Sequence, residues 1–241
     1  MTDAPIQDIA RARAEGREAR IDGALPASPE MAYSLAMQSV GTPAAWKVGG
    51  ANPWSRKVFG NTEVFFGALA PAEVRFLTAE VPLDGLVAPL AEPELALRIA
   101  DPEASDAKTA FDAAALSVEI PASVLPPEAK SILMGQILDR AGAGALWIGP
   151  VLDQAPHEIP DDFTCDFIKN QETAIAGAAA NILPSPLGAA MEMLALCRRY
   201  GIRVTPGQWI ASGGLCPAVP VQPGDRIALS MLGSTVSFDF V

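Results

Sequence analysis

The segment 90–99 alternates between two kinds of side chain, and this alternation most constrains the fold. One face of an extended strand would carry Glu92, Glu94, Ala96 and Arg98, and the other Pro93, Leu95, Leu97 and Ile99. Further strands are expected at 45–48, 116–120, 145–149, 208–211, 226–231 and 235–241. Strands outnumber helices beyond about residue 78 and show no βαβ rhythm, so the sequence predicts an α+β fold with a mixed or antiparallel sheet.

Helical patterns precede the strands and interrupt them. Apolar residues recur at helical spacing from Ile6 to Gly16, and Ser28-Pro29-Glu30 is typical of a helix start. A helix is also expected at about 126–141, and the clearest one runs from Ser185-Pro186 to Gly201. The stretch 51–74 has little periodicity and is expected to form loops. We therefore divide the chain into an N-terminal helical region with loops (1–74) and a β-rich core (75–241).

Composition excludes several classes of function. Of the 241 residues 50% are hydrophobic, enough for a sizeable core, and the net charge of −11 argues against nucleic acid and anionic membrane surfaces as partners. A single histidine, His157, rules out a multi-histidine metal centre. The three cysteines form no CxxC pair, which favours a reducing, cytoplasmic location. No N-terminal signal and no apolar run of roughly 18 residues is found, so no membrane span is expected.

Acidic side chains are the candidates for a metal site. Glu92 and Glu94 point the same way from one strand, with α-carbons roughly 6.5–7 Å apart, a span that one divalent cation can bridge. Glu119, from a second strand, would complete a site made of oxygen ligands, which selects Mg²⁺ or Mn²⁺ over zinc. The spacing alone favours a solvated strand face in which Glu92, Glu94 and Arg98 form an ordinary charge ladder and Glu119 is unrelated.

Two other segments can contribute chemistry. Lys47 lies in an apolar stretch before two glycines, where it could act as an acid, a base or a substrate clamp, or simply end a strand exposed to solvent. The loop Ser212-Gly213-Gly214 could offer backbone N–H groups to a carboxylate, or could be only a turn.

Taken in order, several segments resemble one known family. They are Trp46-Lys47-Val48-Gly49, Glu92-Pro93-Glu94-Leu95-Ala96, Val118-Glu119-Ile120, Asp139 ahead of Trp147-Ile148-Gly149, Pro186-Leu187, Pro206-Gly207-Gln208-Trp209-Ile210, Ser212-Gly213, Pro223-Gly224-Asp225 and Leu232-Gly233-Ser234-Thr235-Val236. This set resembles the 2-keto-4-pentenoate hydratase / 4-oxalocrotonate decarboxylase branch of the fumarylacetoacetate hydrolase superfamily, over nearly the whole chain.

The resemblance implies a small helical N-terminal cap on a mixed β-roll with an all-carboxylate Mg²⁺ or Mn²⁺ site. By position, the metal ligands would be Glu92, Glu94 and Glu119. Lys47 and Asp139 would be catalytic, and Ser212 and Gly213 would bind the substrate. The substrate would be a small unsaturated 2-keto acid or 2-hydroxydienoate, the location cytoplasmic, and the assembly a homo-oligomer or a hetero-complex with a related hydratase or decarboxylase.

Some family positions are replaced in this chain. After Glu119-Ile120 the family usually continues with D-S-R, and here the chain reads Pro121-Ala122-Ser123. Phe65-Phe66 stand where an aspartate is common before Gly67, which implies a more apolar substrate pocket lined by both phenylalanines. The water-activating histidine of the superfamily's C–C hydrolases has no counterpart.

These observations leave several functions open. The first is a hydratase-type lyase in the breakdown of aromatic compounds. The second is a decarboxylase or keto-enol isomerase at the same metal. The third, from a different class, is a non-catalytic subunit that docks on an active relative.

Overall fold

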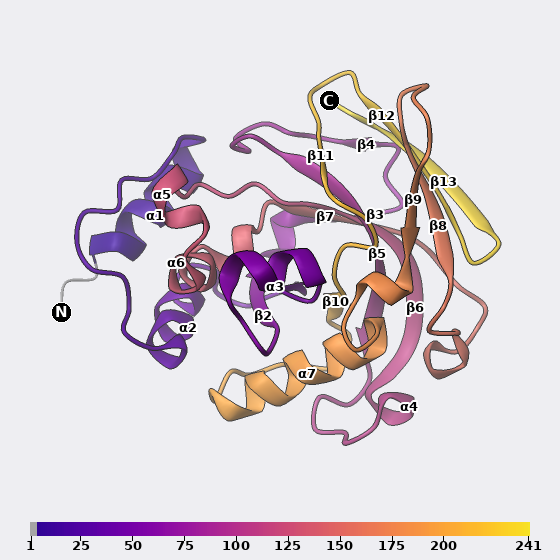
Figure 1. Ribbon diagram of the computed structural model, residues 1–241, viewed down its shortest axis with the longest axis horizontal. Helices are drawn as coiled ribbons and strands as arrows, with labels where there is room; N and C mark the ends of the chain where they lie inside the picture. Colours follow the sequence, from indigo (N-terminus) through magenta and orange to yellow (C-terminus); the bar gives the residue numbers. More distant parts are fainter. Residues whose placement is uncertain (1–3) are drawn as a thin grey trace.

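The computed structural model describes residues 4–241, and a curved mixed sheet forms its centre (Figure 1). This eight-stranded sheet has the order β2-β1-β10-β5-β6-β7-β3, with β11 paired to β5. Its strands are β1 (Ala45–Gly49), β2 (Phe65–Leu69), β3 (Val74–Phe76), β5 (Leu90–Ile99), β6 (Phe111–Ile120), β7 (Ala145–Val151), β10 (Trp209–Ala211) and β11 (Val219–Pro220). The α+β prediction is confirmed, since the sheet mixes parallel and antiparallel pairs and is not built from βαβ units.

A second sheet of five strands packs beside the first. Its order is β4-β13-β12-β8-β9, formed by β4 (Glu80–Val81), β8 (Thr164–Lys169), β9 (Ile175–Ala178), β12 (Arg226–Met231) and β13 (Ser234–Phe240). The predicted C-terminal hairpin is β12–β13. Strands β8 and β9 were not predicted, because their short segments alternate only partly between buried and exposed residues.

Helices cover one side and one end of the sheets (Figure 1). They are α1 (Ala4–Glu15), α2 (Pro29–Met37), α3 (Pro53–Phe59), α4 (Ala107–Ala110), α5 (Pro127–Lys130), α6 (Leu133–Leu138) and α7 (Pro186–Arg199), with 3₁₀ turns η1 (Pro71–Glu73), η2 (Arg140–Gly142), η3 (Pro156–Glu158) and η4 (Ala179–Asn181). The helix expected at 126–141 is broken into α5, α6 and η2, because Ile132 is extended between α5 and α6 and residues 140 and 141 have positive φ angles after α6.

The stretch 51–74 differs most from its prediction. It contains α3 and β2 where loops were expected. All five residues of β2 are buried, so its sequence is a continuous apolar run without alternation. Helix α3 carries signals that the periodicity analysis did not use, namely Pro53 at its first position and Gly60 with a φ angle of 63° at its end. Both β1 and β2 therefore extend the same sheet that carries β5.

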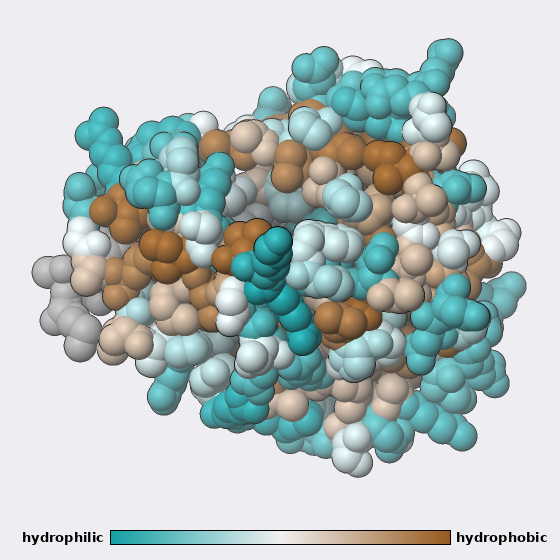
Figure 2. All heavy atoms as spheres, in the orientation of Figure 1, coloured by the Kyte–Doolittle hydropathy of each residue, from teal (hydrophilic) through white to brown (hydrophobic). Residues whose placement is uncertain are grey.

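One helical segment, 179–199, is long and apolar enough to cross a membrane by length and composition alone. Seven of the residues in α7 are buried inside the molecule, so its apolar side already packs against the core. On the face drawn in Figure 2, hydrophobic groups are separated by hydrophilic side chains. The helix thus has the features of a core helix.

Candidate metal centre

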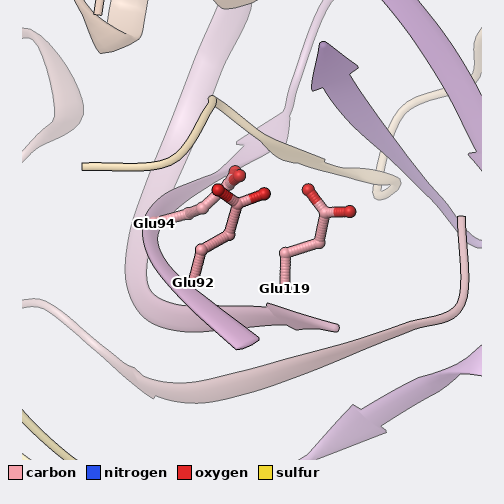
Figure 3. Close-up of side chains that lie close together, drawn as sticks. All are labelled: Glu92, Glu94 and Glu119. Atoms are coloured by element: carbon pink, nitrogen blue, oxygen red, sulfur yellow. The ribbon is translucent and has the colours of Figure 1, made fainter. Parts of the chain in front are cut away.

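Three glutamates converge on one point at the junction of β5 and β6. In the antiparallel ladder Glu92 lies directly opposite Glu119, and Glu94 lies opposite Ser117. Because side chains alternate along a strand, all of these residues share one face of the sheet. One carboxylate oxygen from each glutamate lies within 4.8 Å of the other two (Figure 3). Glu94 and Glu119 are buried, whereas Glu92 remains partly exposed.

The glycine loop after β10 holds one of these carboxylates and lies close against a second. The backbone N–H of Gly213 donates a hydrogen bond of 2.7 Å to Oε2 of Glu94. A Cβ atom on Gly214 would lie 2.1 Å from Oε2 of Glu92, so this position accepts only glycine without displacement. The Nδ2 group of Asn52 donates to the carbonyl of Gly214 at 2.7 Å, which fixes the loop from the N-cap of α3.

A buried lysine faces the third carboxylate. Lys47, on β1, is 4% exposed, and its Nζ contacts Oε1 of Glu119. The two residues belong to strands that are not neighbours in the sheet, so the curvature of the sheet brings them together. The site therefore combines three carboxylates with one ammonium group.

Burial and mutual repulsion keep two carboxyl groups from ionising easily. Burial, and then the charge of Glu119, raises the pKa of Glu92 to about 8, although Lys47 acts in the opposite direction. The same two causes, in the same order, raise the pKa of Glu94 well above its ordinary value, with a further contribution from Glu92. A nearby cation would remove this penalty.

The donor set fits a hard divalent cation. Oε1 of Glu94 and Oε2 of Glu119 are buried and have no hydrogen-bond partner among the described residues. Buried carboxylate oxygens without a partner are costly, and Lys47 supplies a single positive charge against three carboxylates. Oxygen ligands of this kind suit Mg²⁺ or Mn²⁺. The cofactor prediction is confirmed in that the three predicted glutamates do form a cluster able to hold such an ion.

Comparisons with known proteins show which fold this chain shares. No family model matches the chain. A 74-residue stretch is 35% identical to 4-oxalocrotonate decarboxylase of Pseudomonas sp. (strain CF600), covering 30% of this chain and 28% of that enzyme. The structure of 4-oxalocrotonate decarboxylase from Pseudomonas putida G7, complexed with magnesium and adipate, matches 99% of this chain and 97% of that chain, with a TM-score of 0.84 and 20% identity. This chain has the fold of the fumarylacetoacetate hydrolase superfamily.

A more distant superfamily structure shows the same fold. Fumarylpyruvate hydrolase from Pseudomonas aeruginosa, in complex with Mn²⁺ and pyruvate, matches 82% of this chain and 88% of that chain, with a TM-score of 0.63 and 15% identity. The resemblance inferred from the sequence is thus confirmed at the level of the fold.

The two phenylalanines predicted to bind substrate lie on opposite faces of β2. Gly67 is paired with Lys47, so Phe65, two residues away, points to the same face as the lysine. Phe66 points to the other face, where its ring stacks on Tyr33 at 4.2 Å and meets Trp46 edge-on at 6.0 Å. Phe65 therefore remains a candidate for substrate contact, and Phe66 is part of the core.

Of the other predicted residues, Gly213 and Asp139 have partners within the protein and the Ser212 hydroxyl does not. Gly213 uses its N–H on Glu94, and the buried hydroxyl of Ser212 has no hydrogen-bond partner among the described residues. Asp139 is fully buried and bound by Arg13 and Ser123, so its carboxylate is already paired. Sequence reasoning included Gly214 in the predicted loop but missed Asn52, whose only available signal was its place before Pro53 at a helix start.

We expect replacement of Phe66 by leucine to affect stability rather than substrate binding. Loss of the stacked ring should lower the free energy of unfolding by about 1–2 kcal/mol. Because the ring lies on the face away from Lys47, the KM for any substrate should stay unchanged. Urea denaturation and steady-state kinetics measure the two effects, and a large rise in KM with unchanged stability would place Phe66 in the substrate pocket instead.

The raised carboxyl pKa values predict an unusual pH dependence. Between an unfolded value of 4.5 and a folded value of about 8, Glu92 holds a proton in the folded state that the unfolded state has lost. The metal-free protein should therefore lose stability as the pH rises through this window, and Mg²⁺ should stabilise it more at about pH 8.5 than at about pH 6. Melting curves with and without Mg²⁺ test this. The Glu92→Gln variant should lack most of the effect, and an equal Mg²⁺ shift at both pH values would contradict it.

Proposed function

We propose that this protein is a divalent-metal-dependent enzyme that acts on a small unsaturated 2-keto acid. The convergence of Glu92, Glu94 and Glu119 beside the buried Lys47 carries this proposal. The three carboxylates would hold Mg²⁺ or Mn²⁺, and the partly exposed Glu92 marks the side from which solvent and substrate reach them. A 2-keto acid offers a carboxylate and an adjacent oxygen, the hard donors that such an ion accepts in its remaining positions.

Similar proteins support the choice of substrate class. The decarboxylase from Pseudomonas putida G7 was obtained with magnesium and adipate, and the fumarylpyruvate hydrolase with Mn²⁺ and pyruvate. Pyruvate is the simplest 2-keto acid. Because the carboxylate cluster here has the oxygen chemistry that such metals require, the same class of ligand is proposed for this chain.

The residues of the chain have separate tasks in this chemistry. A Mg²⁺ or Mn²⁺ ion held by the three glutamates would supply stabilisation of negative charge on a keto oxygen. Glu92, Glu94 and Glu119 provide the ligands, and the Gly213 N–H keeps the Glu94 carboxylate in place. Lys47 places Nζ next to Glu119, where its ammonium form can deliver a proton to substrate carbon and its neutral amine form, once that proton has left, can take one away. Burial of both residues excludes bulk water from the transfer.

Decarboxylation is the reaction that the comparisons favour. The curated relative and the structure with the highest TM-score quoted above are both 4-oxalocrotonate decarboxylases, whereas none of the proteins named above is a hydratase. Loss of carbon dioxide leaves an electron pair on the keto acid, and Lys47 can protonate the resulting carbanion equivalent. The hydratase reaction predicted from the sequence, and keto-enol isomerisation, would use the same proton transfer.

Proton exchange on a simple keto acid tests the proposal without the natural substrate. Pyruvate in deuterated water should lose its methyl protons in the presence of the protein and Mg²⁺ or Mn²⁺, as followed by NMR. The Glu94→Gln protein should catalyse no exchange. Release of carbon dioxide from 4-oxalocrotonate, compared with water addition to 2-hydroxypentadienoate, then separates decarboxylase from hydratase. If a folded, metal-loaded protein catalysed neither proton exchange nor turnover, that result would favour the non-catalytic subunit.

Assembly and location are part of the same proposal. We expect a cytoplasmic enzyme that forms a homo-oligomer or a hetero-complex with a related hydratase or decarboxylase. Light scattering on the purified protein, followed by co-purification from the native source, tests both forms of assembly.

A further inference from the structure

A largely buried ion pair lies at the turn between α6 and β7, distant in sequence from the three glutamates. We call this turn, residues 139–144, the corner. Oδ1 of Asp139 accepts a hydrogen bond of 2.6 Å from Nη2 of Arg13, and Oδ2 accepts one of 2.7 Å from the hydroxyl of Ser123. Arg13 also donates to the backbone carbonyls of Asp139 and Ala143. The N-terminal helix α1 is therefore tied to the corner by one arginine.

The next residue continues this network on the other side. The guanidinium of Arg140 donates to both carboxylate oxygens of Glu73 at 2.8 Å and to the carbonyl of Ala68 at 2.9 Å. Arg140 and Ala141 have φ angles of 54° and 57°, a left-handed conformation that costs free energy in residues other than glycine. The surrounding ion pairs hold the corner in this conformation.

The corner contacts β2, the strand that pairs with the Lys47 strand β1. A Cβ atom on Gly67 would lie 1.8 Å from the carbonyl oxygen of Arg140, so β2 rests directly on the corner. Gly67 is the register partner of Lys47 in the β1–β2 pair. Movement of the corner would therefore shift the backbone that carries the lysine.

The corner also holds the strand that carries Glu119. Strand β6 ends at Ile120, and the chain continues to Ser123, whose hydroxyl binds Asp139. The N–H of Ala122 donates to the carbonyl of Gly142 at 2.8 Å. One cluster thus contacts β2, which pairs with the Lys47 strand β1, and the segment that directly follows the Glu119 strand β6.

We propose that Arg13 and Asp139 are positioning residues that set the placement of Lys47 relative to Glu119. This inference rests on the proposed function, because it gives Lys47 a part in the reaction. It replaces the catalytic role predicted for Asp139 with an indirect one. The expected consequence is that loosening the Arg13–Asp139 pair slows proton transfer while leaving metal and substrate binding nearly unchanged.

The double variant Arg13→Met/Asp139→Asn is the main test. Removal of Arg13 alone would leave a buried unpaired carboxylate and could unfold the protein, whereas removal of both charges avoids that penalty. We expect the double variant to melt near the wild-type temperature. Its rate constant for Mn²⁺-dependent exchange of pyruvate protons should fall by about 10- to 100-fold. The KM for pyruvate and the Kd for Mn²⁺ should each change by less than about threefold.

Chemical labelling gives a readout that does not depend on activity. Acetylation of the metal-free protein, followed by peptide mass spectrometry, reports access to Lys47, with the exposed Lys57 as internal reference. In the double variant, Lys47 should be acetylated about tenfold faster than in the wild type, because the corner no longer holds β2. The matched control is Arg17→Ala, which removes a partly exposed ion pair to Asp8 on the same N-terminal segment and should change neither readout.

The outcomes separate this inference from the proposed function. Wild-type rates and unchanged labelling in a stable double variant would overturn the positioning role, leaving only a structural one. If the wild-type protein catalyses no exchange, the proposed function fails, and the labelling result still decides whether the corner controls Lys47. Loss of Mn²⁺ binding in the double variant would also contradict the inference, since the pairing of β5 with β6 should keep Glu92, Glu94 and Glu119 in place.

Discussion

Replacement of Glu94 by glutamine is expected to abolish metal binding and turnover while leaving the fold intact. Glutamine has the same shape, so the contact with the Gly213 N–H can be kept, but the buried negative charge is lost. The affinity for Mg²⁺ or Mn²⁺ should fall by more than roughly 100-fold. Mutation of residues that only hydrogen-bond to metal ligands already lowers metal affinity by roughly 10- to 100-fold, and loss of a ligand should cost more. Mn²⁺ binding measured by calorimetry, together with pyruvate proton exchange, gives the two readouts.

The stability of the metal-free variant provides the control for this experiment. Burial and the charges of Glu119 and Glu92 raise the pKa of Glu94, which means that its ionised form is disfavoured in the folded protein. The neutral glutamine should therefore leave the melting temperature of the metal-free protein equal or higher. Glu63→Gln removes an exposed carboxylate paired with Arg199 and should leave metal binding unchanged. A Glu94→Gln protein with wild-type Mn²⁺ affinity would rule out the proposed ligand set.

The parts of this structure that follow from short-range patterns could be predicted from the sequence. The alternation in β5 correctly placed Glu92 and Glu94 on one face, and Ser185 and Pro186 correctly marked the start of α7. In contrast, the alternation on its own could not distinguish a charge ladder from a metal site. Glu119 decides between the two, since the register of β5 against β6 places it directly opposite Glu92. That register depends on pairing between strands, which no local pattern contains.

Contacts between distant segments explain what the sequence did not predict. Arg13 and Asp139 are 126 positions apart, and α1 alone gives no sign that one of its arginines is buried against another part of the chain. For Phe65 and Phe66, the sequence suggested one shared role, whereas the pairing of β2 with β1 sends them to opposite faces. A continuous apolar run does not alternate, so its sequence does not indicate which side chains share a face. Only the pairing of the strands in the sheet shows which face each side chain is on.

Replacement of Lys47 by methionine is expected to separate metal binding from catalysis. The variant should lose about 10²- to 10⁴-fold in the rate of pyruvate proton exchange, because Nζ, beside the three carboxylates, is the proposed proton carrier. The same change removes a cation that competes for Glu119, so Mn²⁺ should bind at least as tightly as in the wild type. Calorimetry and exchange kinetics on one preparation measure both effects, with Lys57→Met as the exposed control. If Lys47→Met instead catalysed proton exchange at the wild-type rate, another group would be the proton carrier. If the variant lost Mn²⁺ binding as completely as Glu94→Gln, the role of the lysine would be to assemble the site, because its ammonium group cannot itself be a metal ligand.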